Sequence, residues 1–307
     1  MQLNINQLLQ QAITAHQESK LDEAENLYRE ILETEPKHPD ANHNLGLISA
    51  SLNKPTEALK LFKTATEENP NIEQFWISYT NQLIKENKLD EAEVACRKAI
   101  EINPSSAEIY NNLGVILNNF GRFDKAEISF KKAIELKPDY AEAYNNLGNT
   151  FTQLKKFEEA EVNYNKAIEL KPDHAEIYNN LGVALDNALK IDKSIDYFKK
   201  AIQINPKYIN AFYNLGNAYL YLEKYDEAIK KYSQILELNP NHTRAQQNII
   251  DILNFHTVDN KNTNSIIVAN NNLKKIKSNF TFNHSSKITD LSNFFENSNK
   301  IIQRHNK

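Results

Sequence analysis

The chain has 307 residues but only one cysteine and six glycines. The single cysteine, Cys96, excludes an intramolecular disulfide and any cysteine-rich zinc or iron–sulfur site. The glycines are too widely spaced to form the phosphate-binding motifs G-x-x-x-x-G-K-S/T or G-x-G-x-x-G, and no H-E-x-x-H motif is present. These absences predict a protein that is not an enzyme and that uses no metal and no cofactor.

Long apolar runs are absent as well. No run approaches the roughly 18 residues that a membrane-spanning helix needs. Residues 1–17 have neither the basic start nor the apolar core of a secretory signal. We therefore expect a soluble protein of the cytoplasm that makes no contact with a membrane.

Charge is distributed unevenly along the chain. Residues 1–254 contain 28 Lys and Arg against 37 Asp and Glu, whereas residues 255–307 contain 8 against 3. Such a switch is typical of the boundary between a folded body and a tail. Lysine pairs at 131–132, 199–200 and 230–231 are interleaved with acidic residues, which is typical of a solvated surface. Because the body is acidic, we expect no nucleic-acid partner.

The prolines reveal an internal repeat. Seven of the nine lie at 36, 70, 104, 138, 172, 206 and 240, each 34 residues after the last. With this proline as position 32, the repeats start at residues 5, 39, 73, 107, 141, 175 and 209. Position 8 is glycine in five copies, position 20 is alanine in six, and position 24 is aromatic in six. The third repeat departs from this pattern with Tyr79, Thr80 and Cys96 at positions 7, 8 and 24, and we expect Cys96 to be a small buried residue.

Each repeat has the apolar spacing of two amphipathic helices. In the fourth repeat, Tyr110, Leu113 and Leu117 share one face of the first helix, and Ala126 and Phe130 share one face of the second. Glycine at position 8 costs about 1 kcal/mol of helix propensity, which indicates that another helix approaches closely there. We expect second helices to end before the proline. We also expect capping boxes at residues 105–108, 139–142 and 173–176.

The pattern of an aromatic residue, Leu-Gly, Ala, a second aromatic, Ala and Pro resembles the tetratricopeptide repeat (TPR) family. The resemblance covers Ile5 to about Leu253. It implies an all-α fold, a right-handed α-solenoid of seven helix pairs within residues 1–254, with a C-terminal capping helix at about 243–254. We expect a flexible Asn- and Lys-rich linker at 255–287. Residues 288–307 are interpreted as a short amphipathic helix or the start of a domain absent from this chain.

Asparagine recurs at position 6 of the first helices. In the TPR family the inner face of these helices lines a concave groove, and an amide side chain both donates and accepts hydrogen bonds. The row is similar to the asparagine ladder of the TPR superhelix in O-linked N-acetylglucosamine transferases. That resemblance implies binding of a peptide backbone, with Asn146 touching only the groove. The candidate peptide-binding residues, with two amides from the same stripe, are Asn44, Asn112, Asn146, Asn149, Asn180, Asn214 and Asn217.

The row could also have no role in binding. Two origins of the row that involve no binding stay open: the chain is rich in asparagine throughout, and one unit could have been duplicated recently. A carboxylate clamp of the kind that holds acidic chaperone C-termini is not expected, since position 5 reads Asn111, Asn145, Asn179 and Tyr213. We expect a non-catalytic scaffold that binds a partner protein or extended peptide in the groove. The alternative is a substrate-recruiting arm of a glycosyl- or sulfotransferase whose catalytic domain lies outside this chain.

Overall fold

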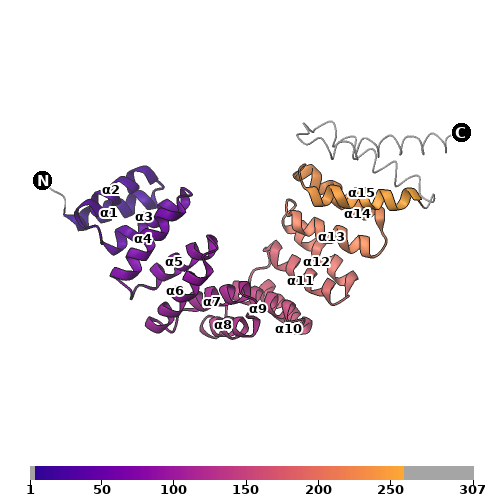
Figure 1. The fold of residues 1–307 in the computed structure, drawn as a ribbon, viewed down its shortest axis with the longest axis horizontal. Helices are drawn as coiled ribbons and strands as arrows, with labels where there is room; N and C mark the ends of the chain where they lie inside the picture. The colour runs from indigo at the N-terminus through magenta and orange to yellow at the C-terminus, as the bar shows by residue number, and fades with distance from the viewer. Residues whose placement is uncertain (1–3, 259–307) are drawn as a thin grey trace. The chain divides into compact units, whose positions relative to one another are not determined.

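The computed structural model describes residues 4–258, which form fifteen α-helices and no strand (Figure 1). The helices are α1 Ile5–Gln17, α2 Leu21–Thr34, α3 Pro39–Ser51, α4 Pro55–Glu68, α5 Glu73–Lys85, α6 Leu89–Ile102, α7 Ala107–Asn119, α8 Phe123–Leu136, α9 Ala141–Gln153, α10 Phe157–Leu170, α11 Ala175–Asn187, α12 Ile191–Ile204, α13 Ile209–Tyr221, α14 Tyr225–Leu238 and α15 Thr243–Val258. α15 therefore includes residues 255–258, where we expected the linker to start. The rest of that linker and the segment 288–307 lie outside the described residues.

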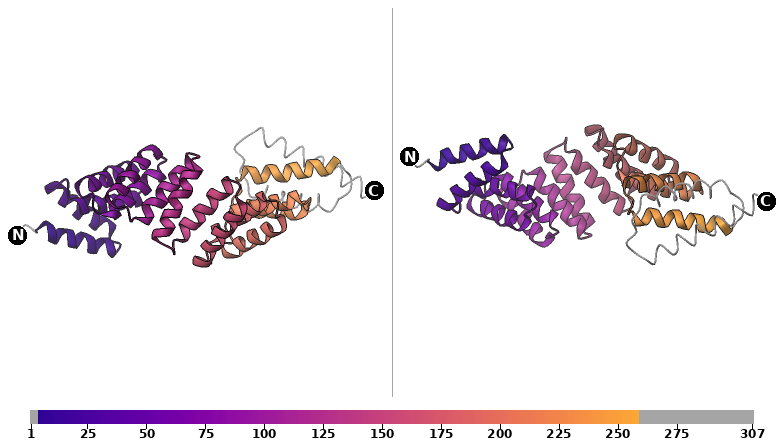
Figure 2. Two further views of the ribbon diagram at one scale, coloured as in Figure 1. Left: turned by 90° about the horizontal axis from the view of Figure 1, so that it is seen from below. Right: turned by 90° about the horizontal axis from the view of Figure 1, so that it is seen from above.

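Helices pack against their neighbours in chain order. α1 packs on α2, α2 on α3 and α3 on α4, and the same order continues to α9 in a first compact unit that ends at Glu159. A second unit begins at Ala160, within α10, and in it α11 to α15 pack in the same successive way (Figure 2). Each unit is thus a stack of helix pairs, the all-α solenoid arrangement predicted from the repeat.

The close approach predicted at position 8 is confirmed, and its partner is the aromatic residue at position 24 of the same repeat. A Cβ atom added at Gly114 would lie 2.5 Å from Cε1 of Phe130, and one at Gly182 would lie 2.5 Å from Cε1 of Phe198. Real Cβ contacts are longer than this, so in these repeats glycine lets the two helices of the pair come this close. The aromatic ring fills the space that the missing side chain leaves.

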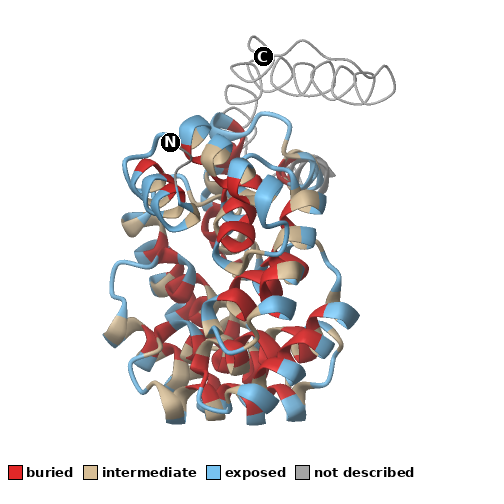
Figure 3. Cartoon of the chain, turned by 90° about the vertical axis from the view of Figure 1, so that its left-hand side faces the viewer, coloured by how far each residue is buried: buried red, intermediate tan, exposed pale blue. Residues whose placement is uncertain are grey.

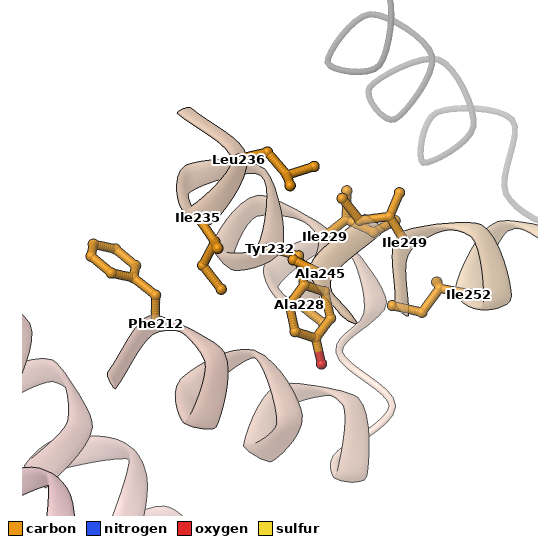
Figure 4. Close-up of a cluster of buried hydrophobic side chains, with 9 residues drawn as sticks. All are labelled: Phe212, Ala228, Ile229, Tyr232, Ile235, Leu236, Ala245, Ile249 and Ile252. Carbon is orange, nitrogen blue, oxygen red and sulfur yellow. The ribbon is translucent and has the colours of Figure 1, made fainter. Parts of the chain in front are cut away.

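Buried residues gather on the helix faces that are turned toward neighbouring helices (Figure 3). At the end of the second unit, α15 places Ala245, Ile249 and Ile252 in a cluster with apolar residues of α14, including Ile229 and Leu236 (Figure 4). The exposed residues of α15 include Gln247 and Asp251, which hydrogen-bond each other at 2.7 Å. One apolar face and one polar face are the arrangement that a terminal helix of a solenoid needs.

The expected capping boxes are wrong for all three helices, although α7 keeps a serine cap one residue later than expected. At α7 the cap is Ser106, whose Oγ accepts a hydrogen bond from Ile109 N at 3.3 Å. The N-caps of α9 and α11 are Tyr140 and His174, and neither makes a side-chain capping bond. The helices begin one residue later than the capping boxes require, so the aspartates at position 33 precede the cap.

Histidine takes over the capping role at the same position elsewhere. Nδ1 of His38 accepts a hydrogen bond from Ala41 N at 3.3 Å, and Nδ1 of His242 accepts one from Ala245 N at 3.1 Å. These two imidazoles therefore satisfy backbone donors in the first turns of α3 and α15. The sequence offered no signal for this beyond their shared position.

The turn inside every repeat contains one left-handed residue, at position 15. The residues with positive φ are Ser19, Asn53, Asn87, Gly121, Lys155, Leu189 and Glu223. Only one of the seven is glycine, although the left-handed conformation costs an L-residue about 1–2 kcal/mol. The repeat therefore imposes this backbone geometry against the preference of most residues that adopt it.

Replacing Leu189 by glycine is expected to stabilise the protein. Leu189 has a φ of 59° and a relative exposure of 72%, so the change relieves strain and removes few contacts. The relief exceeds the entropy that glycine adds to the unfolded chain, which leaves a net gain of about 0.5–1 kcal/mol. Urea denaturation of Leu189→Gly measures the gain, and Leu189→Ala, which keeps a Cβ atom, is the control. Equal stability of the two variants would contradict the prediction.

Candidate functional site

Two of the asparagines at position 6 are paired with asparagines at position 5 of the preceding repeat. Nδ2 of Asn146 donates to Oδ1 of Asn111 at 3.0 Å, and Nδ2 of Asn214 donates to Oδ1 of Asn179 at 2.9 Å. Both partners are on first helices, so these hydrogen bonds connect α7 to α9 in the first unit and α11 to α13 in the second. In both pairs the asparagine at position 5 of one copy accepts a hydrogen bond from the asparagine at position 6 of the next copy, and this bond joins the two first helices.

The third repeat keeps this connection with other residues. Nε2 of His43, at position 5, lies 3.0 Å from Oγ of Ser78, at position 6 of the next repeat. Ile77 occupies position 5 of the third repeat, and its side chain offers no acceptor. Nδ2 of Asn112 instead donates to Thr80 Oγ1 at 2.9 Å and to Asn81 Oδ1 at 2.8 Å.

Positions 5 and 6 of the first helices differ in how far their side chains are buried. Asn111 is only 2% exposed, and Asn145 and Asn179 are also buried. At position 6 Asn112 is buried, whereas Asn146 is half-buried. Asn44, Asn180 and Asn214 are half-buried too. Our expectation that Asn146 touches only the groove is wrong, because its amide also holds two helices together. One hydrogen bond still leaves most of the two donors and two acceptor lone pairs of an amide for other partners.

The two remaining candidates lie three residues further along the first helices. Oδ1 of Asn217 accepts a hydrogen bond from the Tyr232 hydroxyl at 2.7 Å, which ties α13 to α14. Nδ2 of Asn248, on α15, is 3.5 Å from the same oxygen. Asn149 is half-buried on α9. Asn217 is therefore part of the packing of its own helix pair as well as a candidate for peptide contact.

Replacing Asn146 by alanine is expected to cost about 1–2 kcal/mol of unfolding free energy, because the buried Asn111 acceptor loses its donor. Water reaches the half-buried site and limits the loss. Gln153→Ala, an exposed change on the same helix, is the control and should stay within about 0.5 kcal/mol. Chemical denaturation of the variant Asn111→Ala, Asn146→Ala completes the cycle. Its cost should be smaller than the sum of the single losses, and strict additivity would contradict an interhelical hydrogen bond.

Ion pairs cover much of the second-helix surface. Glu93 binds Arg97 on its own helix at 2.7 Å and Arg122 of the next repeat at 3.0 Å. Glu127 repeats the arrangement with Lys131 at 2.6 Å and Lys156 at 3.4 Å. Arg97 and Arg122 hold the pKa of the Glu93 carboxyl below its usual range. Lys131 and Lys156 do the same for the pKa of Glu127. Lys131 is thus neutralised by a neighbouring carboxylate, in agreement with its interpretation as part of a solvated surface.

Cys96 does not have the environment of an activated nucleophile. Cys96 is fully buried, and this burial raises the pKa of its thiol to about 12, so the thiol stays protonated at neutral pH. Among residues 4–258 no group of three or more His, Cys, Asp or Glu side chains could hold a metal ion. Within the same range no helix is both long and apolar enough to cross a membrane.

Solved structures of other helical repeat proteins have the same fold. A tetratricopeptide repeat protein from Parabacteroides merdae superposes with a TM-score of 0.65 at 16% identity, covering 80% of this chain and 96% of that chain. PilW, described as a widely conserved type IV pilus biogenesis factor, superposes with a TM-score of 0.63 at 20% identity, covering 68% of this chain and 97% of that chain. At these identities the likeness is one of fold, and no curated protein matches the sequence.

Family models for the tetratricopeptide repeat match most of the chain. One matches four consecutive 34-residue units, at 107–140, 141–174, 175–208 and 209–242. Two others match residues 15–76 and 81–119. The boundaries of the four units coincide with repeats that start at 107, 141, 175 and 209, as the proline spacing predicts. The chain belongs to the tetratricopeptide repeat family.

Proposed function

We propose that this protein is a non-catalytic scaffold that binds an extended polypeptide along its first helices, through amide side chains at position 6. The tetratricopeptide repeat itself supports the broader role, since stacked repeats create extended surfaces for protein–protein interaction. The observation that carries the finer proposal is the hydrogen-bonded pairing of asparagines on successive first helices, Asn111 with Asn146 and Asn179 with Asn214.

The pairing holds the position-6 amides of Asn146 and Asn214 in a defined place. Packed helices lie about 8–10 Å apart, and an extended peptide rises about 3.3 Å per residue, so one amide meets the peptide about every three residues. Because the amide of Asn146 is oriented by Asn111, little side-chain entropy is lost when a ligand binds. An amide recognises backbone N–H and C=O groups equally well, which predicts a ligand read through its backbone rather than its side chains.

The first helices of the fourth to seventh repeats contain no lysine or arginine, so charge contributes little to this recognition. Each amide–backbone hydrogen bond nets only about 0.5–1.5 kcal/mol after exchange with water. No single asparagine should therefore dominate, and salt should affect binding only weakly.

The test is the fourfold replacement of Asn112, Asn146, Asn180 and Asn214 by alanine. Binding of fluorescently labelled, unstructured peptides of mixed sequence, measured by anisotropy, should weaken at least about tenfold, or 1.4 kcal/mol. Each single replacement should have a much smaller effect. Measurements are made well below the melting temperature of the variant, because the same residues support the helix stack.

The control is Asn118→Ala. Nδ2 of Asn118 donates to Thr150 Oγ1 at 3.0 Å, so this change also removes a hydrogen bond between α7 and α9. Asn118 lies outside the stripe of position 6 and should leave peptide binding unchanged. Binding that survives the fourfold replacement, or that collapses between low and physiological salt, would show that the asparagine row is not the site.

A further inference from the structure

A pocket of about 390 Å³ lies on the second-helix side of the third repeat, between α4, α5 and α6. Its volume is within the range of small-ligand sites. α5 contributes two aromatic side chains, Trp76 and Tyr79, and α6 contributes the half-exposed Val94 among others. The charged residues that line it are Lys63, Glu67, Asp90, Glu91 and Lys98.

Two of the lining residues differ from those of other repeats. Ala95 stands at position 23, which is Leu27 and Leu61 in the two preceding repeats and Ser129 in the next, so a small side chain lies beside the pocket. Tyr79 stands at position 7, where five of the seven repeats have leucine, and it brings a ring and a hydroxyl.

This site is separate from the position-6 row. At 3.6 residues per turn, or about 100° per residue, Ser78 at position 6 points about 160° away from Trp76 and about 100° away from Tyr79 around α5. The pocket therefore opens on a different side of the helix from the proposed peptide-binding amides, and the two sites can be tested independently.

The chemistry of the pocket favours a cation with a planar face. The indole N–H of Trp76 already donates to the Pro70 carbonyl at 2.8 Å, so only the small exposed part of the ring, in a residue that is 8% exposed, can meet a ligand. Three carboxylates and two lysines line the pocket; Lys63 lies 3.8 Å from Glu67, and Lys88, which is not a lining residue, lies 3.3 Å from Glu91. Burial, together with the negative charge of Glu91 and Glu67, raises the pKa of Tyr79.

We propose that this pocket binds the guanidinium group of an arginine side chain from a partner polypeptide. A guanidinium stacks on aromatic rings and pairs with carboxylates through its fork of N–H donors, and it sheds water more readily than an ammonium. Trp76 and Tyr79 supply the exposed parts of two rings, and Glu67 and Glu91 supply the acceptors by exchanging their exposed lysine partners for the guanidinium. The apolar side chain of Val94, 56% exposed, lies where it can contact the methylene stem.

Trp76 is the only tryptophan in the chain, so its fluorescence reports on this pocket alone. The probe is the peptide acetyl-Gly-Gly-Arg-Gly-Gly-amide, titrated while emission and heat are recorded in parallel. The comparison peptides have citrulline, leucine or glutamate at the centre. We expect saturable change with the arginine peptide and about 3–30-fold weaker binding of the citrulline peptide, which has the same shape without the charge. Added salt should weaken arginine binding.

Two variants identify the residues, and both change exposed positions so that the fold is retained. Glu67→Gln combined with Glu91→Gln should weaken arginine binding at least about fivefold by removing the paired carboxylates. Val94→Arg should abolish it by placing a cation at the pocket. The matched control is Glu30→Gln combined with Glu33→Gln on α2, which should change nothing.

Four outcomes would overturn the proposal: citrulline or leucine peptides that bind as tightly as arginine, a glutamate peptide that binds more tightly, heat without any change in Trp76 emission, or no binding up to about 10 mM. The fourfold asparagine variant should bind the arginine peptide normally. Loss of arginine-peptide binding in that variant would place the peptide at the position-6 asparagines instead of the pocket.

Discussion

Replacing Phe130 by alanine is expected to lower the free energy of unfolding by about 3–5 kcal/mol. Phe130 is fully buried, and its ring lies against the backbone of α7 at Gly114. Alanine would leave a cavity between α7 and α8 that glycine on the facing helix cannot fill. In a stack stabilised by nearest-neighbour contacts, the loss should appear first as opening of this helix pair.

Urea denaturation followed by circular dichroism measures the total loss, and amide hydrogen exchange locates it. The control is Ile128→Ala, two residues away on α8, where the side chain is 68% exposed. This change should stay within about 0.5 kcal/mol. Faster exchange confined to helices far from α7 and α8, or equal losses in the two variants, would contradict the role assigned to Phe130.

Replacing Gly114 by alanine is expected to cost about 2–3 kcal/mol, although alanine is the better helix former. The new Cβ atom would lie 2.5 Å from Cε1 of Phe130 and 2.7 Å from both Cδ1 and Cζ. The ring is enclosed and cannot move aside without disturbing the next helix. Overpacking therefore outweighs the gain of about 1 kcal/mol in helix propensity.

The effect of Gly114→Ala on stability should change sign when the ring of Phe130 is removed. In a Phe130→Leu background the atoms that the Cβ would meet are absent, so Gly114→Ala should be neutral or stabilising. Thermal denaturation of the four proteins in this cycle gives the coupling between the two positions. An equal cost of Gly114→Ala in both backgrounds would mean that something other than Phe130 requires glycine at position 8.

The sequence by itself determined those features that depend on local chemistry repeated at a fixed interval. The 34-residue spacing of proline, with glycine, alanine and aromatic residues at set positions, predicted helix pairs that stack, and it predicted a close approach at Gly114. These inferences succeed because helix periodicity and the steric limits of glycine and proline act within one or two turns.

The tertiary structure alone decided what the polar residues do. The pairing of Asn146 with Asn111 and the pocket beside Trp76 both depend on atoms from different helices. The position of an asparagine in the repeat is the same whether its side chain faces solvent or a neighbouring amide, so the sequence left the role of that side chain open. Stacking the repeats brings position 5 of one copy to position 6 of the next, and that juxtaposition turns a row of surface residues into an ordered, hydrogen-bonded series.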